Sequence, residues 1–247
     1  KEGKIIRVLD LNTLEYRDKK RSKFATLEQT KSINNVIDRF KVLVNGQDKA
    51  GEFYRKNFAA MFAYVSNRIP EISEELFKID DAMKAGFGWE HGPFQIWDAV
   101  GVEKGLALIK SEGLNAAQWV FDMLASGNNS FYTIENGATF AFDISTKKQL
   151  KIPGQEAFII LDNIRKSNEV FKNAGVVIED LGDGILNCEF RSKMNTIGGD
   201  VLSGLNKAVY LAEQNFDGLV IGNQGVNFSV GANIGMIFMM AVEQEYD

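Results

Sequence analysis

The sequence predicts an α+β protein that is mainly helical, with a helical domain followed by the first part of an α/β fold. Three observations predict this class. Apolar residues recur three and four positions apart from Gly51 to about residue 125, as in amphipathic helices. Two apolar runs then flank Asn136-Gly137, a pair typical of a β-hairpin turn. From Gly175 onward, short β-rich runs alternate with helical patterns, which is how an α/β fold begins.

These changes of pattern divide the chain into four predicted segments. Residues 1–48 read as a linker or lead-in, and residues 49–152 as a helical domain that ends in a hairpin. Residues 153–174 read as a linker helix, and residues 175–247 as the truncated N-terminal part of an α/β domain. The chain does not begin with Met and ends directly after a helical pattern, so we expect it to be a piece of a longer protein.

The helical domain is predicted from its stripes of apolar residues. Pro70 is expected to open a helix through Ile72 and Met83, because the missing N–H of proline is harmless in a first turn. Gly86 and Gly88 should end that helix. The other predicted helices span residues 33–44, 51–65, 94–100, 102–110 and 115–124.

The second half alternates between strands and helices. Strands are expected at residues 131–134, 138–144, 150–152, 176–178, 185–190 and 219–221. Residues 158–171 should form a helix that bridges two domains, and residues 201–212 a second amphipathic helix. Residues 228–230 are expected to be extended, with the last helix beginning at Gly231.

Composition excludes several classes of function. The 247 residues carry a net charge of −5, which argues against a broad nucleic-acid-binding surface. The single cysteine, Cys188, excludes an intrachain disulfide, and the carboxylates show no metal-ligand spacing, so no metal site is predicted. No apolar run approaches the roughly 18 residues of a membrane span. A cytoplasmic protein fits best.

Isolated chemical groups favour ordinary structural roles. The charged run from Glu15 to Lys23 is typical of a solvated linker, with a phosphate-binding patch as the alternative. His91 reads as a loop histidine, although a base or a ligand is conceivable. Cys188 lies mid-strand, as an inert buried thiol would. Several carboxylates could be acids or bases but are more typical of solvated or capping residues: Asp80, Asp81, Asp98, Glu179, Asp180, Asp183, Glu189 and Asp200, the last as a helix N-cap.

The segment from Gly225 to Asn233 is the most promising site. It runs from a loop through an extended stretch into a helix start, where the first amides lack internal partners and point along the positive end of the dipole. Its small residues would let a ligand approach the backbone. A carbonyl oxygen placed there would be polarised, and an enolate oxygen stabilised more strongly.

This segment resembles the oxyanion-hole motif of the enoyl-CoA hydratase/isomerase (crotonase) family. Phe228-Ser-Val-Gly-Ala-Asn233 stands where that family has Phe-Ser-x-Gly-Ala-Asp, and Arg191 to Ile197 resembles its Lys-x-x-Asn-x-Leu segment. The resemblance implies that the backbone N–H of Ala232 is one of two donors to a thioester oxygen. It also implies a set of residues that line the coenzyme A site: Lys193, Met194, Ser229, Val230 and Gly231.

A second stretch, residues 79–101, resembles the C-terminal helical domain of 3-hydroxyacyl-CoA dehydrogenases. It contains Asp-x-Ala-Met, a glycine-rich turn, Gly-Pro-Phe and Asp-x-x-Gly in order. A dehydrogenase helical domain followed by a crotonase-like domain is similar to bacterial fused fatty-acid β-oxidation proteins. That order implies a parent that hydrates enoyl-CoA and oxidises 3-hydroxyacyl-CoA with NAD, coenzyme A being part of the substrate, and with a thiolase or a second copy as partner.

The resemblance also implies what this chain lacks. The NAD-binding domain would lie upstream, and the hydratase carboxylates and second oxyanion donor beyond residue 247. We therefore expect the chain alone to catalyse neither step. Two alternatives stay open: a non-catalytic acyl-CoA-binding or scaffolding module, and a crotonase-like thioesterase or isomerase.

Overall fold

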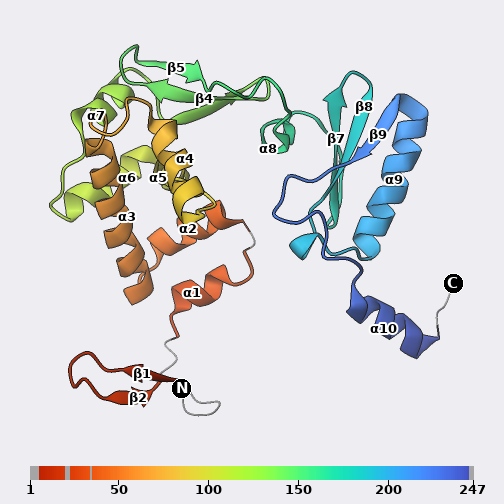
Figure 1. Ribbon diagram of the computed structural model, residues 1–247, viewed down its shortest axis with the longest axis horizontal. Coiled ribbons are helices and arrows are strands. Elements are labelled where there is room, and N and C mark those ends of the chain that lie inside the picture. The colour runs from red at the N-terminus through yellow and green to blue at the C-terminus, as the bar shows by residue number, and fades with distance from the viewer. Residues whose placement is uncertain (1–5, 20–22, 34, 245–247) are drawn as a thin grey trace. The chain divides into compact units, whose positions relative to one another are not determined.

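A computed structural model describes residues 6–19, 23–33 and 35–244 (Figure 1). Its contacts divide the chain into two compact units. Lys1–Ser73 and Ile79–Phe121 make up the first unit, and Glu74–Lys78 and Asp122–Asp247 the second. The predicted mixture of helices and sheet is confirmed.

The predicted lead-in contains regular structure. Strands β1 (Arg7–Leu9) and β2 (Tyr16–Asp18) pair antiparallel, and Asp10 closes their turn by accepting hydrogen bonds from the Asn12 N–H and the Arg17 Nε. The side chains of β2 are exposed, as a solvated charged run should be. Lys20 and Arg21 of that run lie outside the described residues.

Helices fill the chain from residue 25 to residue 125, largely as predicted. They are α1 (Ala25–Thr30), α2 (Val36–Asn45), α3 (Lys49–Asn67), α4 (Leu76–Phe87), α5 (Pro93–Val100), α6 (Val102–Ser111) and α7 (Gln118–Ala125). Asn35 caps α2 and Asp48 caps α3 by accepting hydrogen bonds from first-turn amides. Gly101 ends α5 with a φ of 98°, a conformation that suits glycine.

Stacked aromatic rings form the core of the first unit. The ring centroids of Phe62 and Trp97 are 4.7 Å apart, and those of Phe58 and Phe62 are 5.7 Å apart. The Trp97 Nε1–H donates to the carbonyl of Val102 at 3.1 Å, so the buried indole keeps a hydrogen bond. Such pairs each add about 0.5–1.5 kcal/mol beyond the area they bury.

Asp80 caps helix α5 from a distance in sequence. Its buried carboxylate accepts hydrogen bonds from the backbone N–H groups of Phe94 (2.9 Å) and Gln95 (3.0 Å). The N-cap residue itself is Gly92, which has no side chain, and a Cβ there would lie 2.2 Å from the Asp80 Cβ. Asp80 is therefore a capping carboxylate, which is one of the structural roles expected for it from the sequence.

Pro70 does not open a helix, contrary to the prediction. Helix α3 ends at Asn67, residues 68–72 form turns, and α4 begins at Leu76 after three further non-helical residues. The Ile72 N–H donates to the Arg68 carbonyl, and the Ile72 side chain is exposed while that of Leu76 is buried. The apolar spacing that included Ile72 therefore did not mark a buried helix face.

The predicted hairpin is confirmed as part of a three-stranded sheet. Strands β3 (Tyr132–Glu135) and β4 (Ala138–Asp143) are joined by Asn136 and Gly137, both with positive φ as a type I′ turn requires. Strand β5 (Lys148–Lys151) pairs antiparallel with β4.

The predicted helix at residues 158–171 is wrong. Only α8 (Leu161–Ile164) is helical, and β6 (Glu169–Lys172) pairs with a strand that follows it. The Asn168 side chain donates to the carbonyl of Asp180, and the Asp180 N–H donates to the carbonyl of Asn168. These non-local bonds draw the segment into a sheet and compete with helix formation.

A four-stranded sheet with order β6-β7-β8-β9 carries the rest of the second unit. Strands β7 (Val176–Gly182) and β8 (Ile185–Phe190) pair antiparallel, and β9 (Gly218–Ile221) returns parallel to β8 after α9 (Gly199–Asn215). Helix α9 covers one face of this sheet (Figure 1). The core between them contains Val176, Ile178, Leu186, Cys188, Phe190, Val201 and Ala208.

The last helix, α10 (Ile234–Glu243), begins three residues later than predicted. Asn233 is its N-cap and accepts a hydrogen bond from the Met236 N–H, so Gly231 lies outside the helix. Residues 228–230 form no strand. The extended pairing falls instead on Ala232, which bridges Ile197 in parallel.

Helix α10 exposes its apolar side chains. No residue of the helix is buried in the described part of the chain. The large exposed side chains on it are Ile234, Ile237, Phe238, Met239 and Val242. Such a surface usually associates with another surface.

Replacing Gly105 with alanine should destabilise the first unit. A Cβ there would lie 2.0 Å from the Trp97 Nε1 inside the aromatic core, and overpacking of this kind costs about 1–3 kcal/mol. Gly86→Ala is the matched control, because a Cβ at Gly86 has no atom within 4 Å and should leave stability unchanged or slightly higher. Urea unfolding followed by tryptophan fluorescence measures both, since all three tryptophans lie in the first unit. Equal midpoints for G105A and the wild type would contradict the packing.

The exposed face of α10 should make the chain self-associate. Light scattering after size exclusion is expected to show species larger than the monomer, and Phe238→Glu should reduce them by placing a charge on that face. Phe87→Glu, which replaces an exposed aromatic residue on α4, is the control and should change little. A monodisperse wild-type monomer would overturn this expectation.

Candidate functional site

Two loops of the second unit are bound to each other, and together they carry every predicted site residue. One follows β8 (residues 191–197), and the other precedes α10 (residues 227–233). The Asn195 side chain donates to the carbonyl of Asn227 at 2.9 Å, and the Ser229 hydroxyl donates to the carbonyl of Asn195 at 2.6 Å. The sequence-predicted segments around Lys193 and Ser229 are thus brought together.

The bridge to Ile197 sets the direction of the Ala232 amide. The Ile197 N–H donates to the Gly231 carbonyl at 2.9 Å, and the Asn233 N–H donates to the Ile197 carbonyl at 2.9 Å. The peptide between Gly231 and Ala232 is trans, so its C=O and N–H point in opposite directions. Because the carbonyl faces Ile197, the Ala232 N–H faces away from it.

Ala232 is exposed, and its N–H has no hydrogen-bond acceptor among the described residues. That N–H is not one of the first amides of α10, as the sequence suggested, because Asn233 caps that helix from the position after it. The free donor results from the loop pairing rather than from the helix end. An unpartnered N–H at a surface is available to an incoming carbonyl oxygen.

Gly231 is the residue that allows this loop geometry. Its φ is 94°, in the region where residues with a Cβ are strained, and no atom would obstruct a Cβ there. The requirement for glycine is therefore conformational. The Gly231 N–H donates to the Ser229 hydroxyl at 2.9 Å, which fixes the residue before the free amide.

The remaining predicted residues present exposed side chains on the same pair of loops. Lys193–Asn195 forms a single 3-10 turn in which Met194 has a φ of 55°. The side chains of Lys193, Met194 and Val230 are exposed and could contact a bound molecule.

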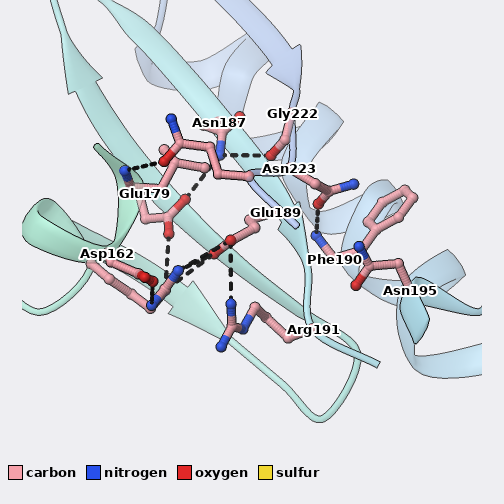
Figure 2. Close-up of polar contacts among 12 residues, drawn as sticks. Asp162, Glu179, Asn187, Glu189, Phe190, Arg191, Asn195, Gly222 and Asn223 are labelled. Atoms are coloured by element: carbon pink, nitrogen blue, oxygen red, sulfur yellow. Dashed lines mark hydrogen bonds and ion pairs between the residues drawn. The ribbon is translucent and has the colours of Figure 1, made fainter. Parts of the chain in front are cut away.

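A buried polar cluster occupies the face of the sheet opposite α9 (Figure 2). The strand register places Glu179, Asn187 and Glu189 on that face, and all three are buried. Arg165, at the end of α8, binds Glu189 through Nε (3.1 Å) and Nη2 (2.9 Å), and its Nε lies 3.8 Å from the Glu179 Oε1. Arg191 contacts the other oxygen of Glu189 at 3.3 Å.

Hydrogen bonds from β8 and its polar face hold the loop that leads to the candidate site. The Asn187 side chain donates to Glu179 Oε2 at 3.0 Å and to the carbonyl of Gly222 at 3.3 Å. Asn223 accepts from the Phe190 N–H and donates to the carbonyl of Phe228 at 2.9 Å (Figure 2 shows the first bond). The position of residues 222–228 therefore depends on β8.

Burial raises the pKa of the Glu179 carboxyl above its ordinary value of 4.5, and the neighbouring negative charge of Glu189 adds to the rise. The hydrogen bond from Asn187 and the charge of Arg165 lower the pKa of Glu179 but do not reverse the shift. Within the described residues its Oε1 is buried without a hydrogen-bond partner, 3.8 Å from the Arg165 Nε. Burial also raises the pKa of the Cys188 thiol to about 11, which keeps it inert, as predicted.

Glu179 and Glu189 were expected to be solvated or capping carboxylates, and the buried cluster that they form was not predicted. Glu189 lies two residues after Asn187, so both face the same side of a strand whose other side is apolar. That alternation was the available signal. The covering arginine lies in a segment predicted to be a helix, so its position could not be inferred. The predicted cap at Asp200 is also wrong, since Gly198 is the N-cap and Asp200 lies in the first turn of α9.

Two features would point to a metal or a dinucleotide: a cluster of metal ligands and a glycine-rich phosphate loop. No group of three or more potential metal ligands occurs among the described residues. Gly182-Asp-Gly184 connects two antiparallel strands rather than a strand and a helix, so it does not fit a dinucleotide phosphate loop. No helix in the described part of the chain has the length and hydropathy needed to cross a membrane.

Comparisons with known proteins place similar sequences in fatty acid oxidation enzymes. The chain is 37% identical over 247 residues to a Bacillus subtilis protein provisionally named 3-hydroxyacyl-CoA dehydrogenase. This match covers all of this chain and 31% of the Bacillus subtilis protein. It is 22% and 24% identical to proteins of Rickettsia felis and Rickettsia prowazekii provisionally named fatty acid oxidation complex trifunctional enzyme. These two matches cover 95% of this chain and 28% of each relative.

The chain thus spans less than a third of the length of the curated relatives it matches. No family model matches the chain, and no solved structure matches it.

Glu179→Gln should change how stability depends on pH. A raised pKa in the folded chain means that the favourable contribution of the neutral carboxyl is complete below about pH 4.5 and is lost as pH rises through the raised value. Glutamine cannot ionise, so the free energy of unfolding of E179Q should fall less than that of the wild type between pH 5 and pH 8. Urea unfolding followed by circular dichroism measures this.

Glu213→Gln, on the exposed side of α9, is the control for removing a glutamate and should follow the wild-type pH dependence. Parallel curves for E179Q and the wild type would contradict a raised pKa at Glu179.

Proposed function

We propose that the two bound loops form an acyl-CoA thioester site and that the chain belongs to a longer fatty-acid β-oxidation enzyme. The Ala232 N–H would donate to the thioester carbonyl oxygen, with Lys193, Met194, Ser229, Val230 and Gly231 beside the coenzyme A moiety. The observation that carries the proposal is that the Ala232 N–H faces away from Ile197 and has no acceptor in the part of the chain that the structure describes.

The chemistry of a thioester explains why one free amide matters. When water adds to the double bond of an enoyl thioester, negative charge develops on the carbonyl oxygen. A donor that is already oriented stabilises this charge without a cost of reorganisation, and the loss of one such donor typically reduces the rate by about 10²–10³-fold. Ala232 would supply one donor. The second donor and the hydratase carboxylates would come from other parts of the enzyme.

The buried glutamates are not suited to replace those carboxylates. Glu189 is held by Arg165 and Arg191, and Glu179 is enclosed beside them with no exposed surface. The chain would therefore bind and polarise a thioester without hydrating it. NAD, which accepts the hydride when a 3-hydroxyacyl-CoA is oxidised, would bind a domain upstream of this chain.

The order of the two parts supports the wider assignment. Residues 79–101 resemble the helical domain of 3-hydroxyacyl-CoA dehydrogenases, and the relatives carry dehydrogenase and fatty acid oxidation names. The parent would hydrate enoyl-CoA and oxidise 3-hydroxyacyl-CoA in the cytoplasm, with a thiolase or a second copy as partner. The helical part would shape an acyl cleft or a subunit interface.

Ala232→Pro tests the site, because proline removes the N–H of residue 232. The two hydrogen bonds of the Ile197 bridge are made by the Gly231 carbonyl and the Asn233 N–H and do not need the N–H of Ala232. Isothermal titration of the wild type with crotonyl-CoA should show binding. A232P should bind crotonyl-CoA roughly tenfold more weakly, equivalent to about 1.4 kcal/mol, yet bind coenzyme A alone as before. Ala232→Ser keeps the N–H and is the matched control.

No crotonyl-CoA binding by the wild type, or equal binding by A232P and A232S, would overturn the proposed site. The wild-type chain should convert neither crotonyl-CoA nor 3-hydroxybutyryl-CoA with NAD. Turnover of crotonyl-CoA to a hydroxyacyl product would show hydratase carboxylates within this chain, and release of free coenzyme A would favour the thioesterase alternative.

A further inference from the structure

We propose that Ser229 is a positioning residue that orients the Ala232 N–H, an inference that rests on the proposed thioester site. Its hydroxyl bonds both loops: it donates to the carbonyl of Asn195 and accepts from the N–H of Gly231. It therefore joins the turn after β8 to the residue that precedes the free amide.

The Ser229 hydroxyl both donates and accepts a hydrogen bond at short distance. The Ser229 Oγ lies 2.6 Å from the Asn195 oxygen and 2.9 Å from the Gly231 nitrogen, both within normal hydrogen-bond range. Serine can act in this way because one hydroxyl is both donor and acceptor. The Ser229 side chain is directed into the loop pair, whereas Phe228 and Val230 on either side of it are exposed.

The Ile197 bridge holds the Gly231–Ala232 peptide through its carbonyl but does not hold the peptide that precedes Gly231. It holds the carbonyl of Gly231 and the N–H of Asn233, but it does not hold the N–H of Gly231. Gly231 has the conformational freedom of glycine, so its φ of 94° needs a restraint on each side. The Ser229 hydroxyl supplies the restraint on the N-terminal side, and with the bridge it fixes the plane that carries the Ala232 N–H.

Three substitutions separate positioning from general loop stability. Ser229→Ala removes both bonds, and Ser229→Thr retains the hydroxyl. Ser192→Ala is the matched control, because the Ser192 hydroxyl donates to the carbonyl of Thr196 within its own loop rather than to the loop at residues 227–233. Thermal unfolding of each variant establishes that it is folded.

Residual dipolar coupling of the Ala232 N–H in the free chain measures its orientation without any ligand. We expect the coupling to change in S229A and to match the wild type in S229T and S192A. An unchanged coupling in S229A overturns the inference, and so does an equal change in S229A and S192A, because that result would show general loosening of the loops.

The infrared carbonyl band of bound, carbonyl-labelled crotonyl-CoA reports the consequence for the ligand. We expect the wild type, S229T and S192A to shift this band to lower wavenumber, and S229A to lose the shift and bind two- to tenfold more weakly. A full shift in S229A overturns the inference. If the wild type binds no thioester, the proposed function fails, and the dipolar coupling still decides whether Ser229 orients the amide.

Discussion

The pairing of Ile197 with the segment around Ala232 is the interaction on which the candidate site depends. It binds the carbonyl of Gly231 and the N–H of Asn233, so the planar trans peptide between Gly231 and Ala232 must direct its own N–H outward. Neither Ile197 nor Ala232 needs a reactive side chain for this. The site consists of backbone groups whose direction is set by two hydrogen bonds, one glycine with positive φ and one serine hydroxyl.

The polar cluster on the face of the sheet opposite α9 explains why the loop at residues 222–228 has a defined position. Arg165 and Arg191 neutralise Glu189, and Asn187 links Glu179 to the carbonyl of Gly222. A buried cluster with several charges contributes little net stability, because desolvation offsets much of the attraction, but breaking one partner is costly. Its specific effect here is geometric, since Asn187 on β8 holds the start of the loop that leads to Ala232.

Local signals in the sequence were sufficient where local interactions determine the structure. The Asn136-Gly137 turn, the helix stop at Gly101 and the strands around Gly182 and Gly184 follow from backbone preferences and apolar spacing. The helix predicted at residues 158–171 was wrong because Asn168 pairs with Asp180, a contact that the apolar periodicity does not reveal. A motif in the sequence suggested the residues of the candidate site, which stay a prediction. The direction of the Ala232 amide, however, depends on Ile197, 35 positions earlier, and not on the helix start.

The central claim is that the Ala232 N–H is free and receives a thioester oxygen. Two-dimensional ¹⁵N–¹H NMR during titration with crotonyl-CoA, with coenzyme A alone as the reference, tests it most directly. We expect the Ala232 amide proton to exchange rapidly with solvent in the free chain, and its resonance to move downfield with the thioester but not with coenzyme A. A slowly exchanging Ala232 amide before ligand is added, or a resonance that the thioester leaves unmoved, would contradict it.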